Sequence, residues 1–159
     1  MRIGAFIMIL AVLSESCGER PRNIEVKVVA AEREAIVIGV RNHSRNDVVL
    51  LSPATPSRQV DEDKCAVYLS TKVDERIRPF AFTPQLITVP GGSETKFRAS
   101  IHPLSLSKPC SRWHITAEYA YIRPDEVEKF AGRPSEEFRQ YVLRNQQIVT
   151  TSESVTIAN

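Results

Sequence analysis

Apolar and polar residues alternate with a period of two along much of this chain, which is the pattern of β-strands with one buried face. The longest and most regular alternation runs from Trp113 to Tyr121, and it predicts a strand at the centre of a sheet. Similar segments and short apolar runs predict strands at 24–28, 35–40, 48–51, 65–69, 86–89, 97–101 and 148–157. The segment 52–64, with its prolines and its acidic run, predicts a loop or a frayed edge.

One stretch departs from the β pattern and predicts two short helices before the last strand. Residues 124–132 have Pro at a helix start, acids in the first turn and Gly just past the end. Residues 135–143 repeat the arrangement. The apolar residues that we assign to a candidate partner-binding face are Phe130, Phe138, Tyr141 and Val142. The other interpretation of this face is a cap over an open end of the core, the ordinary role of an amphipathic helix.

Together these elements predict an all-β fold, an antiparallel β-sandwich of about seven strands with a two-helix insertion before the last strand. Residues 36–50 form an apolar strand, an Asn-x-Ser turn and a second apolar strand, and 87–97 read apolar-Pro-Gly-Gly-polar-Phe. In these two segments the chain resembles the immunoglobulin-like or fibronectin-like sandwiches of bacterial envelope proteins. The resemblance implies an architecture and no ligand. Asn42 to Ser44 also match the glycosylation sequon, which we interpret as turn chemistry.

The first sixteen residues have the three parts of a signal peptide. Met1 and Arg2 give a positive start, residues 3–13 are apolar or small, and 14–16 are short and polar. A helix of the apolar part would span about 16 Å, roughly half of a bilayer's hydrocarbon core, so we expect no permanent transmembrane helix. The predicted organisation is a signal peptide at 1–16, a lipid-attachment Cys and short tether at 17–23, and a β-sandwich domain at 24–159.

The three cysteines leave one unpaired after a single disulfide. Residues 13–17 resemble the lipobox of bacterial lipoproteins, with the aliphatic residue one position early, and this resemblance implies a lipid on Cys17. The alternative is ordinary cleavage after Ser16, which would release a soluble periplasmic or secreted protein. Cys65 and Cys110 are then the predicted structural disulfide, closing a loop of about 45 residues and stabilising the fold by roughly 4 kcal/mol.

Composition and charge narrow the functional classes. Charged residues make up 25% of the chain and hydrophobic residues 42%, as in an ordinary globular domain. The net charge of +2 is scattered, without the basic stripe that a nucleic-acid partner needs. The histidines His43, His102 and His114 lack the spacing of metal ligands, so we expect no metal and no other cofactor.

These observations favour a lipoprotein on the periplasmic face of a bacterial membrane, the outer membrane rather than the inner. It would bind an envelope protein or assist envelope assembly without catalysing a reaction, because no nucleophile motif such as G-x-S-x-G is present. One alternative is an envelope enzyme or a carbohydrate-binding module that uses Trp113, Tyr119 or Tyr121 with Glu118. Another is an inhibitor of a secreted hydrolase, a role that suits small disulfide-bonded sandwiches.

Overall fold

The computed structural model describes residues 23–32, 35–76, 82, 84–100, 110–130 and 135–156. The predicted signal peptide, Cys17 and His102 lie outside these residues. Within the described ranges the strands are β1 (Ile24–Ala31), β2 (Ala35–Asn42), β3 (Val48–Leu51), β4 (Ser57–Asp61), β5 (Ala66–Ser70), β6 (Leu86–Val89), β7 (Glu94–Ser100), β8 (Trp113–Ile122) and β9 (Gln147–Val155). Two helices, α1 (Pro124–Glu128) and α2 (Ser135–Asn145), stand between β8 and β9, as the sequence predicts.

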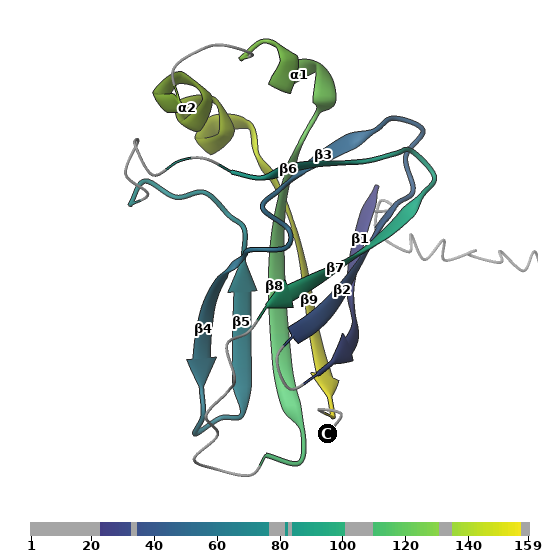
Figure 1. The fold of residues 1–159 in the computed structure, drawn as a ribbon, viewed down its shortest axis with the longest axis vertical. Helices are drawn as coiled ribbons and strands as arrows, with labels where there is room; N and C mark the ends of the chain where they lie inside the picture. The colour runs from purple at the N-terminus through teal and green to yellow at the C-terminus, as the bar shows by residue number, and fades with distance from the viewer. Residues whose placement is uncertain are drawn as a thin grey trace, which may run out of the picture.

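The strands form two sheets, which confirms the all-β prediction in its general form (Figure 1). The smaller sheet has the order β1-β2-β7. The larger has the order β4-β5-β8-β3-β6, with β9 paired to β8 as well. Because β9 pairs with the same residues of β8 that pair with β5, β9 lies on the other edge of β8. The edge of β1 faces β9, and the Val28 amide donates to the Glu153 carboxylate over 2.8 Å.

The main core lies between the two sheets and is built from the alternating apolar residues. In β1, Ile24, Val26 and Val28 are buried, and the residues between them are more exposed. In β8 the same period buries Trp113 and Tyr119 almost completely. Burial of a large apolar side chain stabilises a fold by about 1.5–3 kcal/mol. The period-two pattern therefore identifies the inward faces correctly.

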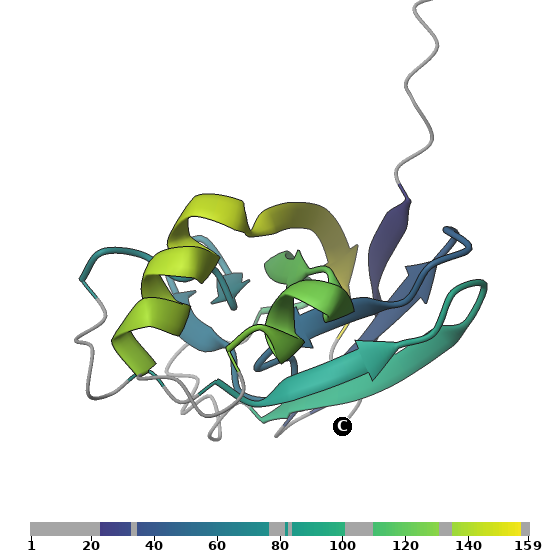
Figure 2. The same cartoon turned by 90° about the horizontal axis from the view of Figure 1, so that it is seen from above.

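A second, smaller core lies on the opposite side of the larger sheet. Its fully buried members come from β3, β8, α2 and the segments at 73 and 82: Val49, Leu51, Val73, Phe82, Ala120, Ile122 and Val142. Figures 1 and 2 show both helices at this end of the molecule, next to the ends of β3 and β8. The helices cover an end of the sheet that would otherwise expose apolar residues.

Two chain crossings, which we call the corner, join the sheets. The turn 42–47 carries the chain from β2 to β3, and the turn 90–93 carries it from β6 to β7. The Asn42 side chain is fully buried there; its amide donates to the Asn46 carbonyl (2.8 Å) and to the Val89 carbonyl (3.1 Å). Its oxygen accepts from the amide (3.0 Å) and the hydroxyl (2.7 Å) of Ser44. The Asn-x-Ser motif at 42–44 therefore forms a turn, as we expected.

The two turns of the corner are packed directly against each other. A Cβ atom on Gly91 would lie 2.4 Å from the Arg45 carbonyl oxygen, a distance that no side chain tolerates. The Gly91 amide donates to the Asp47 carboxylate over 3.0 Å, and the Gly92 amide donates to the Ser44 carbonyl over the same distance. The two segments that carry the sandwich resemblance are thus neighbours in space.

The larger sheet departs from the predicted antiparallel arrangement. β5 runs parallel to β8, and the number of strands among the described residues is nine rather than about seven. The segment 52–64, expected to be a loop or a frayed edge, contains β4, a regular strand paired with β5. β4 escaped prediction because it is an edge strand whose residues are mostly exposed, so its sequence has no apolar alternation.

The Cys65–Cys110 disulfide is formed, as predicted, with 5.9 Å between the two Cα atoms. It joins the starts of β5 and β8, where the His114 amide also donates to the Cys65 carbonyl over 2.9 Å. Parallel strands cannot be linked by a short turn, so their starts are far apart in sequence. The disulfide supplies the local connection that this pair otherwise lacks.

Candidate functional site

The candidate site arises because β3 and β5 share one edge of β8. Ser70 at the end of β5 pairs with Glu118, and Leu50 near the end of β3 pairs with Tyr121. The carboxyl ends of the two strands therefore approach each other, and the chain turns away from the sheet at both. Between them the Ala120 amide of β8 donates to the Thr71 hydroxyl over 2.8 Å. Chain segments that diverge in this way leave an open space beside the sheet.

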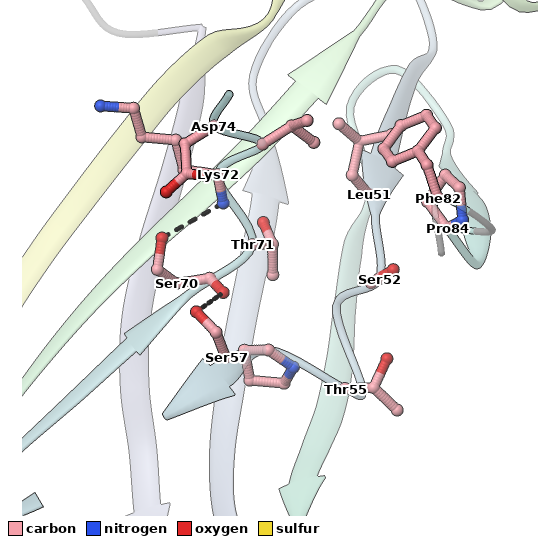
Figure 3. Close-up of a pocket in the computed structure, with 12 residues that line it drawn as sticks. Leu51, Ser52, Thr55, Ser57, Ser70, Thr71, Lys72, Asp74, Phe82 and Pro84 are labelled. Carbon is pink, nitrogen blue, oxygen red and sulfur yellow. Dashed lines mark hydrogen bonds between the residues drawn. The ribbon is translucent and has the colours of Figure 1, made fainter. Parts of the chain in front are cut away.

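This space, which we call the crevice, is a cavity of about 390 Å³ (Figure 3). It is lined by Leu51, Ser52, Thr55, Pro56, Ser57, Ser70, Thr71, Lys72, Val73, Asp74, Phe82 and Pro84. Leu51, Val73 and Phe82 are buried and form an apolar floor, whereas Thr55, Ser57, Lys72 and Asp74 at the rim are polar and exposed. An apolar cavity with a few polar groups around it is the usual form of a binding site.

One wall of the crevice is held by β6 and by the core. Ser52 has a φ of 44°, a left-handed conformation that is uncommon for a residue other than glycine. Its amide donates to the Gln85 carbonyl (2.6 Å), and its hydroxyl accepts from the Gln85 amide (3.1 Å). Below it, the buried Tyr119 hydroxyl donates to the Pro53 carbonyl over 3.0 Å, and burial raises the pKa of this tyrosine. The surrounding bonds thus stabilise the strained backbone.

The opposite wall is held just as firmly. The side-chain amide of Gln146 makes two hydrogen bonds with the backbone of Val73, accepting from its amide (3.0 Å) and donating to its carbonyl (2.7 Å). The Ser57 hydroxyl donates to the Ser70 carbonyl over 2.8 Å, a bond drawn in Figure 3. Both walls are therefore fixed before anything binds, which lowers the entropy cost of recognition.

A second hollowed surface continues from the crevice along the outer face of β4, β5 and β8. It contains hollows of about 510 Å³ and 220 Å³, and Gln59 and Tyr68 line both of them. We call this surface the Tyr68 groove. The Ser70 hydroxyl donates to the Glu118 carboxylate over 3.3 Å. Partial burial and the adjacent Glu118 carboxylate raise the pKa of the Tyr68 hydroxyl, which stays protonated at neutral pH.

The four residues of the predicted helical face lie around the second core. Val142 is completely buried, so it contacts no partner, and its assignment to a partner-binding surface is wrong. Phe138 packs against Phe82 with 5.7 Å between the ring centroids, and Phe130 lies 5.5 Å from Phe138 and 4.7 Å from Tyr141. Because Phe82 lines the crevice, these rings support its floor from behind.

Tyr141 is also enclosed by charged neighbours. Burial raises its pKa to about 12, and the Glu126 carboxylate adds to the rise. The adjacent Tyr141 hydroxyl and an ion pair with Arg123, 2.7 Å away, lower the pKa of Glu126. The Arg123–Glu126 pair thus lies beside the Tyr141 ring.

The aromatic residues of the alternative hypothesis, an envelope enzyme or carbohydrate-binding module, do not form an open platform on the surface. Trp113 and Tyr119 point into the core because they occupy the inward positions of β8, and the Tyr121 hydroxyl donates to Gln147 over 2.7 Å. Glu118 alone of that set faces outward, where it meets Tyr68. Sequence reasoning missed Tyr68 although one signal was present: it is an aromatic residue on the polar side of its strand.

Among the described residues no group of three or more His, Cys, Asp and Glu side chains could hold a metal ion. No helix in the described part of the chain has the length and apolar character needed to cross a membrane. No protein-family model matches this chain, and comparisons with curated proteins and with solved structures find no similar protein.

Proposed function

We propose that this chain is an exported lipoprotein that binds a segment of another envelope protein in the crevice and catalyses no reaction. The crevice is the observation that carries the proposal. Its floor of Leu51, Val73 and Phe82 suits one apolar side chain, and the polar groups of Thr55, Ser57 and Asp74 at the rim suit the backbone groups on either side of it. A buried apolar anchor surrounded by polar contacts is the usual centre of a protein interface.

The disulfide supports the exported location in this proposal, because such bonds persist in oxidising compartments. With Cys65 and Cys110 joined, Cys17 is the third cysteine and has a use as the lipid-bearing residue. We include an immunoglobulin-like kinship in the proposal; the two packed sheets and the corner support it, and the parallel β5–β8 pair departs from it. Intact mass of the membrane-extracted protein tests the lipid, since a chain that begins at Cys17 without added mass contradicts the anchor.

Thr55 gives the most direct test of the crevice, because it is exposed and lies at the rim. A photo-crosslinking amino acid at position 55 should yield one discrete adduct in the native envelope. The same substitution at Thr150, an exposed residue of β9 outside the crevice, is the matched control and should not yield it. Mass spectrometry of the adduct then identifies the captured segment.

A synthetic peptide of that segment completes the test. It should bind the wild-type protein in calorimetry and lose at least about tenfold in affinity for the Thr55→Trp variant, whose indole fills the crevice. Thr55→Trp should unfold at the same denaturant concentration as the wild type, because position 55 is on the surface. Equal binding to both proteins, or adducts from positions 55 and 150 alike, would show that the crevice is not the binding site.

A further inference from the structure

The outer face of the larger sheet carries the Tyr68 groove, which adjoins the crevice and shares Ser57, Ser70, Lys72 and Asp74 with its lining. The strand register aligns Gln59, Tyr68, Thr116 and Ser152 in one row across β4, β5, β8 and β9. Tyr68 is 36% exposed, one of the few large apolar side chains on the described surface with that much exposure. Its ring lies between the hollows of about 510 Å³ and 220 Å³, so a ligand can contact it on either side.

Short side chains with hydroxyl or amide groups surround this ring. The Thr116 and Ser152 hydroxyls lie 3.2 Å apart, and in the next row the Ser154 hydroxyl lies 2.8 Å from the His114 Nδ1 atom. Each hydroxyl both donates and accepts hydrogen bonds, so the row can pair with a ligand rich in hydroxyl groups. The row itself carries no charged side chain, since it consists of Gln59, Tyr68, Thr116 and Ser152.

The charges that line the two hollows balance: the cations are Arg58, Lys72 and Arg76, and the carboxylates are Asp61, Asp74 and Glu118. Asp61 is in an ion pair with Lys64 over 2.9 Å, and Asp74 lies 3.8 Å from Arg76. Glu118 already accepts a hydrogen bond from Ser70. The groove therefore has no net charge to attract a strongly charged polymer. Apart from the Tyr68 ring, the larger hollow is lined by polar side chains, so it lacks the apolar depth that a peptide side chain needs.

From this combination we infer that the Tyr68 groove binds an uncharged glycan chain. A sugar ring has an apolar C–H face that packs on an aromatic ring, and hydroxyl groups at its edge that pair with planar polar groups. Tyr68 supplies the ring, Gln59 and Glu118 supply the planar polar groups, and the hydroxyls of β8 and β9 continue the surface. Two sugar units would occupy the hollows on either side of Tyr68, with the chain running along β5.

The test uses two soluble uncharged probes, the pentamer of N-acetylglucosamine and cellopentaose, titrated into the isotopically labelled full chain and followed by NMR. At least one should shift the amide signals of Gln59, Tyr68 and Thr116. Tyr68→Ala should weaken the affinity at least about tenfold, and Tyr68→Phe should keep it within about threefold, because the ring is retained. Ile148→Ala, an exposed position on the same sheet face outside both hollows, is the matched control and should bind like the wild type.

If neither probe binds up to its solubility limit, the inference is overturned. It is also overturned if the Tyr68→Ala variant binds a probe as tightly as the wild type does. Shifts confined to the crevice and abolished by Thr55→Trp would also overturn it, because the sugar would then occupy the other site. The peptide assay with Thr55→Trp is independent of these results, so either idea can fail while the other stands.

Discussion

The corner and the crevice are two places where the chain leaves a sheet, and they are completed in opposite ways. At the corner the space is filled: Asn42 is buried with every polar group paired, and Gly91 leaves no room for a methyl group. At the crevice the walls are held by bonds of similar number, but about 390 Å³ between them is open. Native interiors are normally packed without such voids.

The difference separates structural polar groups from functional ones. Hydrogen bonds at the corner close a joint between the sheets, so their loss should affect stability alone. Those around the crevice stabilise a strained residue, Ser52, and the segments 52–57 and 70–74, which line the open space. Rigid walls around an open apolar floor are what a preorganised binding site requires. Three substitutions test this contrast, beginning with the largest expected effect.

The double substitution Cys65→Ser/Cys110→Ser should lower the free energy of unfolding by about 4 kcal/mol, since it frees a loop of 45 residues in the unfolded chain. Denaturant titration measures the loss. Amides that exchange only through global unfolding should all accelerate by the same factor, because the loss arises in the unfolded chain. Amides of β4 and β5, next to the removed bond, should accelerate at least as much. Unchanged exchange of the globally protected amides would contradict the expected loss of stability.

Asn42→Ala should lower the free energy of unfolding by about 3 kcal/mol, because it leaves buried donors and acceptors at the corner without partners. Asn46→Ala is the matched control. Position 46 is exposed and contributes only its backbone carbonyl to the described contacts, which alanine keeps, so the free energy of unfolding should fall by less than about 0.5 kcal/mol. Peptide binding at the crevice should be unchanged in both variants. Weakened binding in a folded Asn42→Ala protein would contradict the separation of the two regions.

Tyr119→Phe should cost about 1 kcal/mol at neutral pH through the lost hydrogen bond to Pro53. The pH dependence of the free energy of unfolding tests Tyr119 more specifically than its value at neutral pH. Because burial raises the pKa of Tyr119 above its ordinary 10, the unfolded chain releases the proton first, and stability falls as the pH rises above 10. The variant should show a shallower fall, by at most about 1.4 kcal/mol per pH unit. The remaining slope comes from other groups whose pKa values are also raised, among them Tyr68, Tyr121, Tyr141 and Lys64.

The sequence pattern predicted those features of the fold that depend on interactions between residues close together in the chain. The period of two gave the buried faces of β1, β2 and β8, the helix signals gave the starts of α1 and α2, and the cysteine count gave the disulfide. Each of these features depends on residues close in sequence or on a small number of combinations. The Asn-x-Ser turn belongs to the same group.

The crevice could not be predicted in this way. It depends on β3 and β5 meeting on one edge of β8, through pairs of residues 48 positions apart for β5 and 71 or 73 apart for β3. The parallel direction of β5 and the edge position of β4 are equally non-local. Tyr68 became a candidate only when the register placed it opposite Gln59 and Thr116, because an exposed aromatic in one strand says nothing about its neighbours.

A pulling force on the N-terminus would be transmitted to the domain at the corner. The His43 amide donates to the Asn23 carbonyl over 2.7 Å, so the first described residue is bonded to this joint. If the chain is tethered through Cys17, tension between the membrane and a partner in the crevice loads the Asn23–His43 bond first and then peels β1 from β2 bond by bond. The Asn42 side chain is bonded to Asn46, Val89 and Ser44 rather than to β1, so the corner would stay closed while β1 separates, and the β1–β2 ladder would set the force that the anchored domain withstands.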